Sequence, residues 1–393
     1  MKFLENFVRK LEPSFKEGGK LHKFHPVYDG LATFLFTPDH TTHKGAHIRD
    51  GIDLKRTMVT VILALVPAMI FGMWNVGHWH FTALGETASM GDKFIYGLIK
   101  VLPIIVVSYA AGLGVEFAFC IAKGHQIQEG FLVSGLLIPL VMPPDVPLWM
   151  VALGTIFAVI FAKEVFGGTG MNIVNVALTA RAFLFFAYPT FTSGEVWISG
   201  DKTKFIDGYT GATNLGHLAT LVDNPTQKEA VMTKVATLQD TFLGIEPGSI
   251  GETSALAILI GGVILILTGI GSFRIMASMF AGGFVMQSIF NAWGANPYME
   301  VDPMHQLMMG GFMFGMVFMV TDPVTAAQTA TGKIIYGFLA GMFSIMIRVF
   351  NPAYPEGVMM AILLANVLAP TIDHFVIQSN IKRRLNRAKL KTA

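Results

Sequence analysis

The chain has 393 residues, of which 53% are hydrophobic and only 14% are charged, whereas a soluble domain usually carries about a quarter charged residues. With 41 glycines and 23 methionines, this composition excludes an ordinary soluble domain and predicts a polytopic helical membrane protein. The single cysteine, Cys120, excludes an internal disulfide and a cysteine-ligated iron–sulfur or zinc cluster within this chain alone. The net charge of +2 gives no reason to expect nucleic acid as a partner.

Ten segments are apolar and about as long as a membrane span, which needs about 20 such residues. In chain order they are 57–76, 96–122, 130–147, 149–166, 173–190, 253–271, 275–293, 306–321, 333–350 and 357–376. The third segment is rich in proline, with Pro139, Pro143, Pro144 and Pro147. The eighth ends at Asp322-Pro323. Because proline interrupts the backbone hydrogen-bond ladder, both segments are predicted to be broken helices, which a membrane tolerates only where protein or a cavity covers them.

Lysine and arginine predict which side of the membrane each end of the chain faces. Ten lie within residues 1–56 and six within 380–391, so both termini are expected on the cytoplasmic side. The polar loop 191–250 carries four lysines against seven acids and follows five spans, so it is expected on the opposite side. Arg348 fits this pattern less well, because it lies near the outer end of the ninth span, and we expect it to face protein.

The halves on either side of the polar loop have the same plan. Each has five spans, and the third of each is broken. Because five is odd, we predict two inverted five-helix repeats, an arrangement that places functional sites near the membrane midplane. The predicted fold is therefore all-α and polytopic, with a cytoplasmic segment 1–55, a first repeat 56–190, a non-cytoplasmic loop 191–250, a second repeat 251–378 and a basic cytoplasmic tail 379–393.

The polar loop contains the sequence DGYTGAT, residues 207–213. Its two glycines permit tight turns, and the small Ala212 leaves the hydroxyl of Thr213 uncrowded. An accessible hydroxyl of this kind can carry a phosphate ester. An ordinary Asp-Gly surface turn is the alternative interpretation, because such turns are common.

This stretch resembles the motif D-x-x-[ST]-G-A-T, at which a flavin transferase attaches FMN through its phosphate to the last threonine. The matching residues are Asp207, Thr210, Gly211, Ala212 and Thr213. The chain also resembles, nearly end to end, the family of the B subunits of sodium-translocating NADH:quinone oxidoreductases, which is related to the D subunits of Rnf complexes. Segments that carry this resemblance include HIRDGIDLKRTM, AKEVFGGTG, PGSIGETSALAILIGG, GGFMFGMVFMVTDPV and NPAYPEGVMMAILLANVLAP. The resemblance implies FMN esterified to Thr213 on the non-cytoplasmic side.

A second candidate flavin site follows a glycine-rich turn before the fifth span. Asn172 and Asn175 lie three residues apart, on about the same face of a helix, and their carboxamides can donate and accept hydrogen bonds as the edge of a flavin ring requires. A helix N-terminus with a capping turn is the alternative. The resemblance implies a riboflavin site here. The family commonly reads G-[KR]-N-x-x-N-P-A, whereas this chain has Met171 at the basic position and Val176 at the proline position.

Acids within membrane segments are costly and are candidates for function. Glu116 lies in the second span, Asp322 ends the eighth, and Asp373 closes the tenth. Because hard cations prefer oxygen ligands, all three are candidates for a sodium path. Asp322 could instead cap a helix, and Asp373 could pair with the basic tail. Glu116 could instead line a quinone pocket with Gly112.

The histidines and the methionine-rich run are both expected to have no part in a binding site. The histidines match no spacing typical of a metal site, and we expect them to be solvated or interfacial. The methionine-rich run 304–320 is expected to pack against other helices, helped by its glycines, although methionine would also suit the neighbourhood of a flavin ring.

The resemblance implies a membrane subunit of a respiratory sodium pump in the bacterial inner membrane. Electrons from NADH would enter through other subunits, among them an NADH-oxidising flavin and iron–sulfur subunit and a second flavinylated subunit. They would reach FMN on Thr213, pass to riboflavin and then to ubiquinone or menaquinone, and drive Na⁺ outward. The implied partners also include the flavin transferase and membrane lipid. The alternatives are the D subunit of an Rnf-type complex, which serves electron exchange between ferredoxin and NAD, and a channel or transporter without a redox role, which broken helices also suit.

Overall fold

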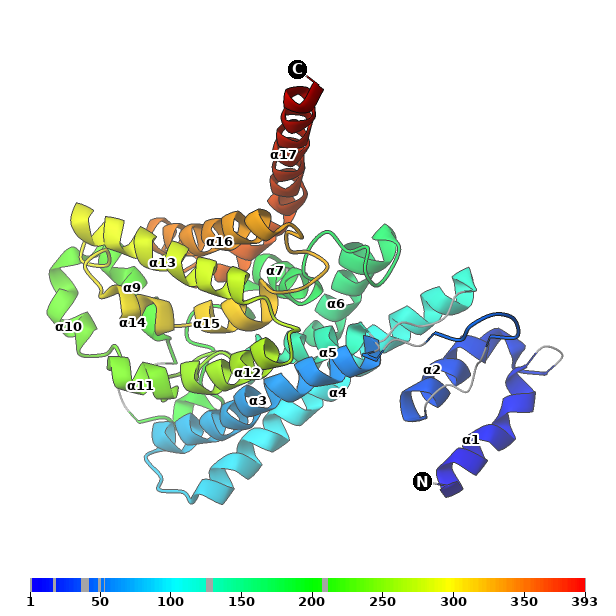
Figure 1. Cartoon of the computed structure of the whole chain (residues 1–393). Coiled ribbons are helices and arrows are strands. Elements are labelled where there is room, and N and C mark those ends of the chain that lie inside the picture. The colour runs from blue at the N-terminus through cyan, green and yellow to red at the C-terminus, as the bar shows by residue number, and fades with distance from the viewer. Residues whose placement is uncertain are drawn as a thin grey trace.

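The structure is a computed structural model that describes residues 2–16, 19–36, 42–48, 51–52, 54–124, 130–206 and 211–392. Regular structure in these residues is entirely helical (Figure 1). Before the polar loop lie α1 (Lys2–Phe15), α2 (His25–Leu35), α3 (Leu54–Leu84), α4 (Met90–Lys123), α5 (Phe131–Leu140), α6 (Leu148–Ala158) and α7 (Val176–Ala187). Short helices follow, namely α8 (Pro189–Thr192), α9 (Asn214–Asp223), α10 (Lys228–Met232) and α11 (Leu238–Leu243). The last part contains α12 (Ala255–Leu267), α13 (Phe273–Trp293), α14 (Pro303–Met308), α15 (Phe312–Phe314), α16 (Ala330–Phe350) and α17 (Val358–Thr392).

Six helices in the described part of the chain are long and apolar enough to cross a membrane. They are α3, α4, the stretch Leu148–Phe166 that begins with α6, α13, α16, and α17 as far as Arg387. Three further helices, α5, α7 and α12, are apolar but shorter. The prediction of an all-helical polytopic membrane protein is therefore confirmed. The inverted relation of the two halves, and the five-part division based on it, stay predictions.

Both proline-containing segments form short or interrupted helices, as the prolines predict. Helix α5 ends at Leu140, one residue after Pro139, and its ten residues cover only about 15 Å of the ~30 Å apolar core of a membrane. The eighth segment consists of α14, α15 and a π-helical turn, Gly315–Met319. It ends just before Asp322-Pro323. Both segments are therefore half-length helices surrounded by protein.

Two predicted spans have different limits in the structure. The fifth was expected from residue 173, but α7 begins only at Val176, because the preceding Gly167, Gly168 and Gly170 have φ values of 123°, 95° and 89°, outside the helical region. The tenth was expected to end near residue 376, but α17 continues to Thr392. The basic tail is therefore part of one long helix.

Glycines allow the closest helix contacts in the bundle. A methyl group added to Gly282 of α13 would overlap the carbonyl of Phe338, and one added to Gly341 of α16 would overlap the carbonyl of Met279. The same is true of Gly97 in α4 against α3. Small residues in membrane helices let backbones approach in this way. The pairs α3–α4 and α13–α16 are therefore tightly joined.

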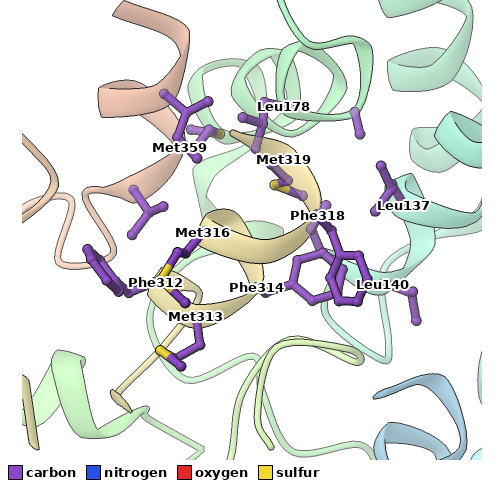
Figure 2. Close-up of a cluster of buried hydrophobic side chains, with 14 of the residues drawn as sticks. Leu137, Leu140, Leu178, Phe312, Met313, Phe314, Met316, Phe318, Met319 and Met359 are labelled. Carbon is purple, nitrogen blue, oxygen red and sulfur yellow. The ribbon is translucent and has the colours of Figure 1, made fainter. Parts of the chain in front are cut away.

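The methionine-rich run forms the centre of the molecule. Figure 2 shows α15 and the π-helical turn packed against side chains of α5, α7 and α17, namely Leu137, Leu140, Leu178 and Met359. Phe312, Phe314, Met316, Phe318 and Met319 are all at most 5% exposed. The expectation that this run packs against helices is confirmed. The benzyl ring of Phe318 fits where α12 has Gly261, since a methyl group there would lie 2.6 Å from its Cζ atom.

Figure 1 places α9, α10 and α11 at one end of the bundle and α1 and α2 at the other. Arg348 is completely buried near the end that holds α9. Its guanidinium donates to the carbonyls of Glu356 (2.8 Å), Gln306 (2.7 Å) and Met309 (3.0 Å). The expectation that Arg348 faces protein is thus confirmed, and its hydrogen bonds tie the end of α16 to the link between α14 and α15.

Candidate functional site

Thr213 occupies the start of α9. Its Oγ1 accepts a hydrogen bond from the Gly216 amide at 3.1 Å, so Thr213 is the N-cap of the helix. Gly211 and Ala212 precede it outside regular structure. The other two motif residues, Asp207 and Thr210, lie outside the described residues. The described end of the motif is therefore held at a helix terminus, and Thr213 itself is half-buried.

The residue after Thr213 fixes the position of this helix terminus. The side chain of Asn214 donates to the carboxylate of Glu246 and accepts from the Ala236 amide at 3.1 Å. Glu246 is 3% exposed, and its own carbonyl accepts from the Asn75 side chain of α3 at 2.8 Å. Burial raises the pKa of Glu246 to about 8. Thr213 is thus connected through two buried side chains to the membrane helices.

A cavity of about 500 Å³ lies directly beside Thr213. Its wall is built from α7, the segments 192–197 and 246–253, the Gly310-Gly311 turn, and the segment 352–356 between α16 and α17. Its aromatic lining comes from Phe185, Trp197 and Tyr354. The volume is within the range of small-molecule and cofactor sites, about 300–1,000 Å³. The space next to the hydroxyl is thus large enough for a cofactor ring.

Arg181 is the basic residue in the lining of this cavity and is only 1% exposed. It donates to the Val141 carbonyl and, at 3.1 Å, to Oε2 of Glu356, and its guanidinium lies 5.2 Å from the centre of the Trp197 ring. Its Nε has no hydrogen-bond partner among the described residues, nor does the buried Oγ1 of Thr253. Buried polar atoms usually have partners, so these two atoms are available to a bound group.

Two carboxylates meet at the floor of the cavity. A methyl group added to Gly311 would lie 2.7 Å from Oε1 of Glu252 and 2.9 Å from Oε1 of Glu356. Burial, and then the charge of Glu356, raise the pKa of Glu252 to about 8. The lining therefore offers aromatic faces, an arginine and hydrogen-bonding carboxyl groups, which suit a ligand with an apolar ring and a polar edge.

A second cavity, of about 120 Å³, lies at the other ends of the same elements. It brings together Asn172, Asn175 and Asp322, which the sequence had placed in two separate sites. Asn175 is also the N-cap of α7, since its Oδ1 accepts from the Leu178 amide at 3.1 Å. Asp322 accepts from the Val324 amide at 3.0 Å and from the Thr325 hydroxyl at 3.1 Å. Asn175 therefore caps α7, and Asp322 stabilises a local turn.

The two departures from the common family sequence do not block this second cavity. Met171 is 65% exposed and does not line it. Val176 is the first residue of α7, the position at which proline is favoured, so the helix begins with either residue. Within the described part of the chain, the carboxamide of Asn172 makes a single long contact, 3.4 Å, to the Val174 carbonyl, which leaves it available for a ligand.

Three elements run from one cavity to the other. Helix α7 and its N-cap contribute Asn175 to the smaller cavity and Arg181 to the larger one. The segment that contains α15 contributes Asp322 to the smaller and Gly311 to the larger. Helix α5 lines the smaller cavity, and the carbonyl that follows it, of Val141, binds Arg181. The apolar core of Figure 2 lies along these elements, so the two cavities share one framework.

Glu116 lies outside both of these cavities. Its carboxylate accepts a hydrogen bond from the ammonium of Lys163, and both side chains are buried. Lys163 belongs to a π-helical turn, Val159–Lys163, and lines the smaller cavity. Such turns often occur at functional sites. Gly112 likewise lines neither cavity and instead makes room for the ring of Phe131. The quinone role of Glu116 and Gly112 stays a prediction.

Asp373 binds the segment that leads into a neighbouring helix, α16, whose N-cap is Thr329. Its carboxylate accepts from the amides of Gln328 (2.6 Å) and Thr329 (3.0 Å) and from the Thr329 hydroxyl (2.5 Å). It therefore ties α17 to the start of α16. A sodium role for Asp373 stays a prediction, and it would require these contacts to be exchanged for the ion.

A family model and individual relatives both assign the chain to one protein family. Residues 41–382 match the model of the family described as "NQR2, RnfD, RnfE family". Three bacterial relatives are each named as the B subunit of a "Na(+)-translocating NADH-quinone reductase". The protein of Pseudomonas paraeruginosa is 46% identical over 98% of this chain and 99% of its own length. That of Azotobacter vinelandii is 46% identical (97% and 98%), and that of Chromohalobacter salexigens is 45% identical (98% and 96%).

Proposed function

Because the chain belongs to the NQR2, RnfD, RnfE family, we propose that it is the B subunit of a sodium-translocating NADH–quinone reductase. The observation that carries this proposal is the 46% identity to proteins of that name over 98% of the chain. The helical membrane fold supports it. The chain would act only within a complex that supplies the NADH-oxidising and iron–sulfur components, in the bacterial inner membrane with both termini cytoplasmic.

The larger cavity is the proposed site of FMN, attached through its phosphate to Oγ1 of Thr213. When bound, the flavin supplies one- and two-electron chemistry that protein side chains lack. Arg181 would donate a hydrogen bond from Nε to the ring edge, and its positive charge would stabilise added negative charge. Glu356 holds the arginine in place, and Trp197 offers an aromatic face. Because Thr213 caps α9, the attachment point is rigid.

The smaller cavity marks the proposed site of riboflavin, held without a covalent bond. At about 120 Å³ it is smaller than a typical cofactor site, so the surrounding side chains would have to move apart to admit the ring. Asn172, Asn175 and Asp322 would bind the polar ring edge. Electrons would then pass from the first site to the second through the framework of α5, α7 and α15, and on to ubiquinone or menaquinone. Glu116, Asp322 and Asp373 are the candidate residues for the coupled Na⁺ path.

Removal of the Asn172 carboxamide is expected to deplete the second flavin. We expect Asn172→Leu to bind the second flavin about ten-fold more weakly, because a lost hydrogen bond to a buried ligand costs roughly 1.4 kcal/mol. Heat or acid denaturation of the purified complex should therefore release less free flavin than from the parent. Met171→Lys should release as much as the parent, because this side chain is exposed. Equal release from all three proteins would contradict the assignment of Asn172.

Covalent attachment is tested by making the chain with and without a flavin transferase. The denatured band is expected to fluoresce under ultraviolet light only when the transferase is present. A dark band in both cases would refute the FMN proposal and favour a channel or transporter without a redox role. The matched family also includes Rnf proteins. The complex of a quinone reductase should reduce quinone with NADH, whereas an Rnf-type complex should reduce NAD with ferredoxin. Measuring both activities in the complex therefore distinguishes these two functions.

A further inference from the structure

Asp145 lies in the proline-rich segment between α5 and α6 and connects three parts of the chain. Its Oδ1 accepts from Lys100 Nζ of α4 at 2.9 Å and from Ser199 Oγ at 2.8 Å. Its Oδ2 accepts from the Gly200 amide at 2.8 Å. Proline restricts the backbone on both sides of this residue, and three donors hold its carboxylate. Asp145 is therefore an anchor for the segment that contains Ser199 and Gly200.

That segment, residues 193–200, is here called the outer strap, and it forms one wall of the larger cavity. Ser193, Gly194, Glu195 and Trp197 all line the cavity. Trp197 is half-buried, covers Arg181 with its ring, and donates from its amide to the Gly211 carbonyl at 3.3 Å. The outer strap is therefore bound to Asp145 at its Ser199–Gly200 end and, through the nearby Trp197, to the segment just before Thr213.

The Ser199–Gly200 end of the outer strap packs tightly against His80, which leaves it little room to shift. His80 Nδ1 is hydrogen-bonded to the Ser199 carbonyl at 2.7 Å, and its ring stacks on Tyr96 at 3.9 Å. Gly200 has φ 133°, and a methyl group there would lie 2.8 Å from His80 Nδ1. Only glycine suits such a conformation with so little space. The hydrogen bond from the Gly200 amide to Asp145 therefore depends on this glycine.

We propose that Asp145 is a positioning residue for the Thr213 cavity, which it serves by holding the outer strap so that Trp197 closes the wall over Arg181. The inference rests on the proposed function, because it assigns the wall to a flavin ring. The alternative role of the same carboxylate is to pair with Lys100 and stabilise the packing of α4. The two roles differ in which of the three contacts matters.

Variants of each contact separate these roles in the full complex made with the transferase. Asp145→Ala removes all three contacts, and Gly200→Ala disturbs the bond from the strap to Asp145 but leaves the Lys100–Asp145 ion pair. Lys100→Met removes the ion pair and leaves both strap bonds. The measurements are iodide quenching of flavin fluorescence and the rate of trypsin cleavage at Lys202 and Lys204, which follow the outer strap in the sequence and are exposed.

Asp145→Ala and Gly200→Ala are expected to raise the iodide quenching constant toward that of FMN free in solution and to speed trypsin cleavage. The strap should open about ten-fold more often, because charge-assisted hydrogen bonds have been lost. Lys100→Met should match the parent in both measurements. Asp145→Asn keeps an acceptor and should lie between the parent and Asp145→Ala.

Each contrary result has a distinct meaning. Faster cleavage without a change in iodide quenching would overturn the proposed role in the cavity. Equal effects of Lys100→Met and Asp145→Ala would show that the ion pair is what matters and would also overturn it. A parent band without covalent flavin would refute the FMN proposal itself, and with it the assignment of the outer strap to a flavin.

Discussion

Replacing Thr213 with alanine is expected to abolish the covalent flavin completely. The phosphate ester needs the Oγ1 atom, and the neighbouring Asn214 offers no hydroxyl, since its side chain is an amide already bound to Glu246. The measurement is ultraviolet fluorescence of the denatured band, normalised to total protein, in material made with the transferase. We expect full fluorescence in the parent and none in Thr213→Ala.

A matched variant separates loss of the ester from loss of the helix cap. Thr213→Ala also removes the hydrogen bond to Gly216, which costs about 1 kcal/mol of stability. Thr213→Asn should restore the cap, because asparagine is a favoured N-cap residue, yet it cannot carry the ester. It should therefore be as stable as the parent and still dark. Fluorescence that persists in both variants would place the flavin on another residue.

Replacing Glu116 with leucine is expected to destabilise the protein by about 3–5 kcal/mol, because the ammonium of Lys163 would remain buried without its partner. Glu116 is 2% exposed and Lys163 is 4% exposed, so bulk solvent does not reach the ammonium in place of the carboxylate. The measurement is the thermal unfolding midpoint in detergent, together with the half-life at a fixed temperature, since membrane proteins often unfold irreversibly.

The double variant Glu116→Leu with Lys163→Met should recover most of the lost stability, because it replaces the ion pair with apolar groups of similar size. It also distinguishes structure from function. If Glu116 belongs to a sodium path, the double variant should be stable but should lose the sodium dependence of quinone reduction. If the double variant is no more stable than the single one, the buried pair is not the source of the effect.

Most helices could be predicted from the sequence because the patterns that mark them lie within short stretches of the chain. Proline marks the ends of α5 and of the eighth segment, and runs of apolar residues mark most membrane helices. The limits that were wrong depend on subtler features. The start of α7 is set by three glycines with positive φ, and α17 extends to Thr392 because its tail consists mainly of residues with good helix propensity.

The site was only partly predictable. The resemblance implied Thr213 as the proposed attachment residue, but Arg181, Glu252 and Glu356 are far apart in sequence and meet only through packing. One signal was present, since Arg181 stands within an apolar run and a charge there is costly. Asp322 was assigned to a sodium path, and only the structure shows it beside Asn172 and Asn175. No local pattern relates residue 322 to residue 172.

The glycine contacts between α13 and α16 restrict how the second half of the molecule can deform. Helices whose backbones touch at Gly282 and Gly341 cannot slide past one another by a helical turn, so the pair behaves as one rigid lever. Bending is easier where the helical ladder is already interrupted, and two such segments, 141–147 and 320–329, border elements that line the cavities. Movement at either segment would therefore alter the proposed redox sites.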